Sequence, residues 1–193
     1  ILINKNNLIN NLSEIKKLSP NSKVMTMIKS DAYGHGVIET AKLLRDSDAF
    51  TVATMEEAKY LRDSNINKEI VCLQGFSNKN EYEYCSKNNI KPVIHDLFQI
   101  SIIKETQLEN KIRIWIKIDT GMNRLGFNNS DFQMIYNICK KNKKIDKPIG
   151  IMTHLACADE NQDNFSLKQI DRLEKIIGTC LLYTSDAADE GFC

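Results

Sequence analysis

The chain has 193 residues, of which 42% are hydrophobic and 26% are charged, a composition typical of one soluble domain with a sizeable core. Its net charge of +1 argues against a partner such as nucleic acid or a membrane surface. No window approaches the length of apolar sequence that a membrane span requires, and no signal peptide is visible. The six cysteines form no CxxC pair, which favours reduced thiols and a cytoplasmic location.

Hydrophobic periodicity predicts strands and helices that alternate along the chain. A first helix ends before Pro20. The predicted strands are then residues 23–28, 49–53, 69–75, 91–96, 111–119 and 147–155. Each is followed by a helical segment, and the one after the second strand begins with Thr54 and Glu57 at the spacing of a capping box.

This order of six strand-then-helix units predicts a parallel sheet covered by helices. Both a doubly wound sheet and a (β/α)8 barrel have this order. Doubly wound dinucleotide binders carry GxGxxG after the first strand, whereas the stretch here reads SDAYGHG (30–36) and lacks that spacing. We therefore predict an α/β fold, a partial (β/α)8 TIM-type barrel with about six of the eight units.

The last residues differ in style from the rest of the chain. From Cys180 the sequence reads CLLYTSDAADE, which resembles the translation of an adapter used in sequencing libraries. We expect residues 1–178 to form the incomplete barrel domain and residues 179–193 to be a non-native tail. The first residue is Ile1 rather than Met, so the natural N-terminus is expected to lie further upstream.

Candidate functional residues follow the predicted strands, because functional groups of parallel α/β folds collect at the carboxyl ends of strands. Lys29 ends an apolar strand and precedes SDAYGHG, which contains Tyr33 and two glycines. It is either a solvated strand-end charge or a partly desolvated amine. Burial disfavours the ammonium form of a lysine, and a neutral amine can form a Schiff base with a carbonyl compound.

Two more stretches follow the fifth and sixth strands, namely DTGMNRLGF (119–127) and THLACADE (153–160). In the first, Arg124 could bind a carboxylate or could be tied to Asp119. Lys117 lies on the same strand face as Asp119, and it needs a partner or a modification if that face is the barrel interior. His154 could be a ligand, a base or a hydrogen-bonded core histidine. No His/Cys cluster has the spacing of metal ligands, so no metal is expected.

Together these stretches resemble the alanine racemase family, pyridoxal-phosphate enzymes built from a barrel and a β-domain. VMTMIKSDAYGHG is similar to the cofactor-lysine signature of that family, IKIDTGMNRLGF to a second signature and GIMTHLACADE to a third. The likeness extends in order over residues 1 to about 178.

The resemblance implies a role for each candidate residue. Lys29 would hold pyridoxal 5′-phosphate covalently and act as the base or acid on one face of the substrate. Tyr33 would bind the cofactor phosphate, and His154 would lie behind the cofactor. Arg124 would bind the substrate carboxylate, supported by Lys117, which is carbamylated in some family members.

Racemisation needs a proton-transfer group on each face of a planar carbanion, and the resemblance implies that the second group is a tyrosine from the C-terminal β-domain of a partner subunit. That β-domain is absent from residues 1–193. We therefore expect a parent protein that is a homodimer, acts on a small amino acid and converts L-alanine to D-alanine for cell-wall peptidoglycan, and we expect this chain to be an inactive N-terminal fragment.

Other functions remain open. A non-catalytic single-barrel carrier of pyridoxal phosphate would explain the length, but such proteins are not expected to contain DAYGHG or DTGMNRLGF. The parent could instead be a racemase for another small amino acid such as serine, or a barrel decarboxylase. The chain could also be a fragment with no biochemical activity.

Overall fold

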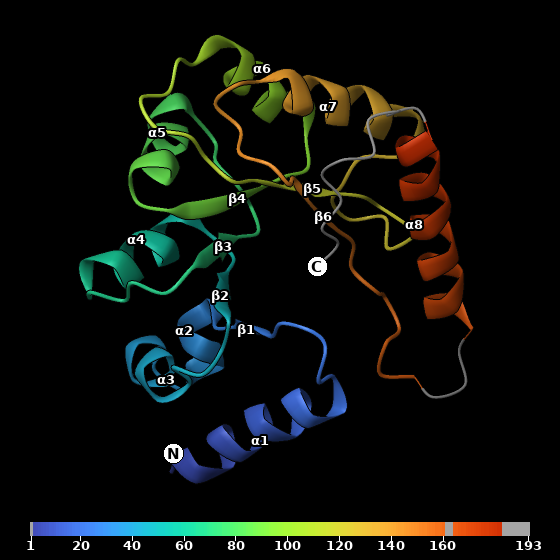
Figure 1. The fold of residues 1–193 in the computed structure, drawn as a ribbon. Helices are drawn as coiled ribbons and strands as arrows, with labels where there is room; N and C mark the ends of the chain where they lie inside the picture. The colour runs from blue at the N-terminus through green and yellow to red at the C-terminus, as the bar shows by residue number, and fades with distance from the viewer. Residues whose placement is uncertain (1, 161–163, 183–193) are drawn as a thin grey trace.

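The computed structural model describes residues 2–160 and 164–182, and it shows six parallel strands side by side with helices on the outer side of the curved sheet (Figure 1). The strands are β1 (Met25–Met27), β2 (Ala49–Val52), β3 (Ile70–Cys72), β4 (Ile90–Ile94), β5 (Trp115–Lys117) and β6 (Gly150–Met152). The helices are α1 (Lys5–Leu18), α2 (Lys29–Gly34), α3 (Val37–Leu43), α4 (Met55–Asp63), α5 (Lys79–Lys87), α6 (Leu97–Glu105), α7 (Asn129–Lys141) and α8 (Phe165–Leu182).

The strands pair in the order β1-β2-β3-β4-β5-β6, which is the order in the chain. A doubly wound sheet reverses its strand order at a switch point, so that alternative is excluded. The predicted partial (β/α)8 barrel is confirmed as an open half-barrel of six units. Because all pairs are parallel, the carboxyl ends of the six strands meet along one edge.

Mostly apolar side chains cover both faces of the central strands, with Thr51 and Lys91 as buried exceptions. Every residue of β2, β3 and β4 is buried, as expected for a parallel sheet covered by helices. The helices add one apolar stripe each, and in α4 the stripe consists of Met55, Ala58 and Leu61. Burying one such large side chain contributes about 1.5–3 kcal/mol, so this core stabilises the half-barrel.

The capping box predicted at the start of α4 is confirmed. The hydroxyl of Thr54 accepts a 3.2 Å hydrogen bond from the N–H of Glu57, and the Glu57 carboxylate accepts one of 3.2 Å from the N–H of Thr54. A cap of this kind contributes about 1 kcal/mol to stability.

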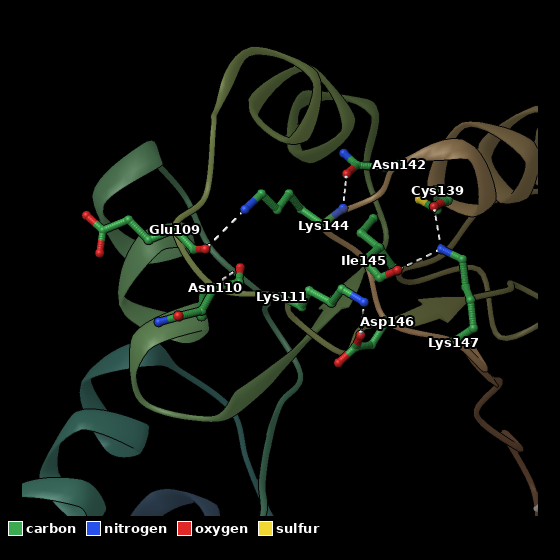
Figure 2. Close-up of polar contacts among 10 residues, drawn as sticks. Glu109, Asn110, Lys111, Cys139, Asn142, Lys144, Ile145, Asp146 and Lys147 are labelled. Atoms are coloured by element: carbon green, nitrogen blue, oxygen red, sulfur yellow. Dashed lines mark hydrogen bonds and ion pairs between the residues drawn. The ribbon is translucent and has the colours of Figure 1, made fainter.

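The strand predicted over residues 111–119 is interrupted. Only Trp115–Lys117 forms the β5 ladder, while Ile112 makes a separate bridge to Ile145. The bridge lies at the amino ends of β5 and β6, where lysines tie the chain together (Figure 2). Lys147 donates to the carbonyls of Cys139 and Ile145, at 2.9 Å each.

Two further links close the same end of the sheet. Lys144 donates to the carbonyl of Glu109 at 3.0 Å, and the Lys111 ammonium lies 3.7 Å from the Asp146 carboxylate (Figure 2). These contacts are at the opposite edge from the candidate residues, where barrel side chains contribute to stability rather than to chemistry.

Helix α8 ends at Leu182, four residues beyond the predicted boundary at residue 178. Residues 183–193 lie outside the described residues, so the non-native tail stays a prediction. Within the described part of the chain, no helix has the length and apolar character needed to span a membrane.

Candidate active site

The five candidate residues lie together at the carboxyl edge of the sheet. Lys29 follows β1, Lys117 ends β5, Arg124 lies on the loop after β5, and His154 follows β6. The charges of Arg124 and Lys29 both act on Lys117, and the charges of all three act on His154. The Lys29 ammonium lies 6.0 Å from the centre of the Tyr33 ring. Strands at opposite ends of the half-barrel therefore contribute to one cationic site.

The segment after Lys29 has an unusual backbone conformation. Residues 30–33 form a left-handed helical turn, with φ angles of 53–54° and ψ angles of 38–52°. None of them is glycine, and a left-handed conformation costs about 1–2 kcal/mol for each such residue. The turn therefore needs interactions from outside itself.

Two hydrogen bonds to carboxylates link the turn to segments outside it. Oε1 of Glu57 accepts a 2.6 Å hydrogen bond from the N–H of Ser30, and Oδ1 of Asp31 accepts one of 2.7 Å from the N–H of Val37. The chain leaves the turn through Gly36, whose φ of 84° suits glycine. The result is a hydrogen-bonded turn that carries Lys29 at its start and leaves Tyr33 59% exposed.

Lys117 is buried, with only 7% of its surface exposed. Across residues 2–160 and 164–182, its ammonium makes no hydrogen bond or ion pair. The pKa of Lys117 is lowered, first by burial and then by the charge of Arg124, while Asp119 opposes the shift. A buried amine needs a partner or a modification, and the described residues supply neither a hydrogen bond nor an ion pair to it.

The loop that carries Arg124 is closed by backbone hydrogen bonds. The N–H of Phe127 donates to the Lys117 carbonyl, and the N–H of Asp119 donates to the Phe127 carbonyl, both at 2.9 Å. Oδ1 of Asp119 accepts from the backbone N–H groups of Gly121 and Asn123. The Asp119 carboxylate is thus engaged by the loop backbone, and the exposed guanidinium of Arg124 is not tied to it within the described chain.

His154 lies on the surface of the site rather than in the core. Its pKa is lowered, first by partial burial and then by the positive charges of Arg124, Lys117 and Lys29. An exposed ring surrounded by cations is not a core histidine, so that alternative from the sequence analysis is excluded.

Two hollows flank the loop after β5. A small one is lined by candidate residues Lys117 and His154, together with Met122 and Leu125. A larger cavity of about 640 Å³ lies between the start of α6, the loop and α8, and its lining includes Asp96, Asn128 and Arg172. None of the five candidate residues lines the larger cavity.

Sequence reasoning missed the residues that support this site. Glu57 was noticed only as a helix cap, although its carboxylate also holds the turn after Lys29. Gln169 was not singled out, although its side chain is fully buried. Its position four residues before Leu173 and seven before Ile176 places it on the core face of α8, and a polar residue on that face was the available signal.

Comparison with known proteins gives a consistent result. The family model described as alanine racemase, N-terminal domain, matches residues 3–184. The alanine racemase of Coxiella burnetii (strain CbuG_Q212) is 44% identical over 180 residues, which are 91% of this chain and 50% of that protein. The alanine racemase of Shewanella loihica is 36% identical over 166 residues, which are 86% of this chain and 46% of that protein.

Solved structures agree with the sequences. Alanine racemase of Clostridium difficile 630 superposes with a TM-score of 0.83 at 32% identity, over 95% of this chain and 52% of that one. The biosynthetic alanine racemase from Pseudomonas aeruginosa superposes with a TM-score of 0.83 at 26% identity, over 88% of this chain and 48% of that one. The chain spans about half the length of the curated relatives it matches. It belongs to the alanine racemase family.

Proposed function

We propose that the protein is a pyridoxal-phosphate-dependent racemase that interconverts L- and D-alanine, and that this chain forms the cofactor-binding half of its active site. The observation that carries the proposal is the convergence of Lys29, Lys117, Arg124 and His154 at the carboxyl ends of β1, β5 and β6. The D-alanine would supply peptidoglycan synthesis, and the buried cysteines Cys72, Cys85 and Cys139, all free thiols, are consistent with a reducing cytoplasm.

The site fits the cofactor of this family, which is pyridoxal 5′-phosphate. The cofactor carries an aldehyde and a phosphate, and the substrate carries a carboxylate. Lys29 offers a half-buried amine on a hydrogen-bonded turn, and the surplus positive charge around Lys117 and Arg124 suits anionic groups. When bound, the cofactor withdraws electrons from the substrate Cα and so acidifies the Cα–H bond.

Each residue has a separate task in the proposed reaction. Lys29 Nζ would hold the cofactor and would take or return the Cα proton on one face of the substrate. The Tyr33 hydroxyl donates to the phosphate, and the Arg124 guanidinium binds the substrate carboxylate. His154 would lie behind the cofactor, and its lowered pKa favours the neutral ring at pH 7.

Lys117 is proposed to be carbamylated. Burial and neighbouring cations lower the pKa of its amine, so more of the amine is neutral and able to attack CO₂. The new N–C bond gives a carbamate anion and releases one proton. That anion would supply the negative partner that Lys117 and Arg124 lack in the described chain. Incubation with ¹³C-bicarbonate should give a carbamate NMR signal that is absent in Lys117→Met.

The second face of the substrate requires a group from elsewhere. In this proposal a tyrosine from the partner subunit of a homodimer fills that role, as the family resemblance implies. Residues 1–193 alone should then bind the cofactor weakly or not at all and should not racemise alanine. Measurable D-alanine formation by this chain alone would contradict that part of the proposal.

One experiment tests the central claim. The full-length gene product is incubated with pyridoxal 5′-phosphate, reduced with borohydride, digested and analysed by mass spectrometry. The pyridoxyl label should be on Lys29, and D-alanine should form before reduction but not in Lys29→Ala. A label on Lys29 without turnover would favour a non-catalytic carrier, and faster turnover of serine than of alanine would favour a serine racemase. The absence of label would reject the cofactor assignment.

A further inference from the structure

Gln169 is a fully buried amide on α8 that contacts the loops after both β5 and β6. Its Oε1 accepts a 2.9 Å hydrogen bond from the N–H of Ala156. Its Nε2 donates to the carbonyl of His154 at 2.9 Å and to Oγ1 of Thr120 at 3.1 Å. The amide therefore binds the backbone at His154 and at Ala156, and both N–H groups of its Nε2 donate a hydrogen bond.

The hydrogen bonds continue from Gln169 through two threonines. Oγ1 of Thr153 donates its only proton to the Ile118 carbonyl, at 2.9 Å. In its other hydrogen bond, at 2.8 Å, Oγ1 of Thr153 must therefore accept from the hydroxyl of Thr120. The Thr120 oxygen in turn accepts from Gln169. The chain of donors thus has one direction, from the amide on α8 to the end of β5, and each buried group in it is satisfied.

The same device occurs elsewhere in the half-barrel. Gln99 on α6 is also fully buried. Its Oε1 accepts from the N–H of His95 at 2.8 Å, and its Nε2 donates to the carbonyls of Gln74 at 3.0 Å and Phe76 at 3.3 Å. Each glutamine therefore joins the loop after its preceding strand to the loop one strand earlier. Of these two sets of hydrogen bonds, the one made by Gln169 includes a candidate site residue, His154, and the one made by Gln99 does not.

We propose that Gln169 is a positioning residue for the active site: its amide fixes the backbone of His154 against the loop that carries Arg124, so that both side chains take one arrangement toward the cofactor. This inference rests on the proposed function. His154 is exposed, so packing does not hold its ring. The location of the ring therefore depends on the His154 backbone, whose carbonyl accepts a hydrogen bond from Gln169.

The test compares Gln169→Met with the matched control Gln99→Met in the full-length protein. Methionine has nearly the same length as glutamine but makes none of these hydrogen bonds. Both variants lose the hydrogen bonds of one buried amide. Gln99→Met also loses the 3.3 Å hydrogen bond from the N–H of Asp96 in the capping box of α6, so its melting temperature should fall at least as far. Gln169→Met alone should speed amide exchange of Ala156 by about fivefold or more. It should also raise the Kd for pyridoxal phosphate by a similar factor. In the cofactor-free protein in CO₂-free buffer, it should move the NMR titration of the His154 ring upward as the ring leaves its cationic neighbours.

The outcomes separate positioning from general stability. The inference is wrong if Gln99→Met weakens cofactor binding as much as Gln169→Met does at an equal melting temperature. It is also wrong if Gln169→Met leaves both cofactor binding and the His154 titration unchanged. If Gln169→Met does not fold, Gln169→Glu keeps the acceptor for Ala156 and loses both donors, and it should weaken cofactor binding. If the wild-type protein binds no cofactor, the proposed function fails, while Ala156 exchange and the His154 titration still decide whether Gln169 positions this backbone.

Discussion

The backbone N–H of Ser30 donates a 2.6 Å hydrogen bond to Oε1 of Glu57, which lies 27 residues later in the chain. The other oxygen of this carboxylate accepts from the N–H groups of Ala53 and Thr54. One side chain therefore caps helix α4 and also holds the left-handed turn that follows Lys29. The position of the candidate catalytic lysine depends on a residue from the next β-then-α unit.

Replacing Glu57 should disturb both functions of its carboxylate. We expect Glu57→Ala to lower the free energy of unfolding by about 2–3 kcal/mol, because a helix cap and a charge-assisted hydrogen bond are both lost. Amide exchange at Ser30 should become faster. The control Thr54→Ala removes only the hydroxyl half of the cap. If Thr54→Ala accelerates exchange at Ser30 as much as Glu57→Ala does, the link from Glu57 to the turn is not the cause.

Gly126 should not tolerate a side chain. A Cβ atom there would lie 2.7 Å from the N atom of Asp119 and 2.9 Å from the carbonyl carbon of Ile118, and its φ is 128°. Gly126→Ala should therefore destabilise the protein by more than about 1–3 kcal/mol, the usual cost of one strained residue, and open the Arg124 loop.

The control for this substitution is Gly178→Ala in α8, where a Cβ atom would meet no atom within 4 Å. It should leave stability unchanged or raise it by up to about 1 kcal/mol, because alanine favours helix. Urea denaturation measures both variants. Equal effects of the two substitutions would contradict the steric explanation.

Tyr82 has a buried hydroxyl that makes no hydrogen bond to any described residue. Its ring packs on Phe76 with centroids 4.6 Å apart, and burial raises the pKa of the phenol well above its ordinary value. Tyr82→Phe keeps the ring and removes the unsatisfied hydroxyl, so thermal unfolding should show unchanged or higher stability, by up to about 1–3 kcal/mol. A clear loss of stability would mean that a buried water satisfies this hydroxyl.

Lys117 should make stability depend on alkaline pH. Its folded-state pKa is below its ordinary value, so between the two pKa values the unfolded chain binds more protons than the folded protein. Stability then rises with pH in that window, and the cost of the buried charge is complete below it. In CO₂-free buffer, the free energy of unfolding of the wild type relative to Lys117→Met should increase as the pH rises through this window toward the ordinary lysine pKa of about 10.5. A constant or falling difference in urea denaturation would contradict a lowered pKa.

Much of the architecture could be read from local patterns. The alternating strands and helices, the capping box at Thr54 and the end of α1 before Pro20 all depend on residues within a few positions of each other. The signature stretches with Lys29, Arg124 and His154 follow strands, and parallel strands bring their carboxyl ends together, so a common site was predictable as well.

The exact form of the site was decided by contacts between distant residues. Residues 30–33 have no local preference for a left-handed turn, which is stable because Glu57 binds it from the next unit. Lys117 is buried without an ion pair to any described residue, and this burial depends on which face of β5 is covered. The joining of the loops after β5 and β6 depends on one amide from α8. Sequence alone therefore determined the elements, their order and the chemistry available at the strand ends. Tertiary structure decided how these groups are held, because buried hydrogen bonds and desolvation arise only when distant segments pack together.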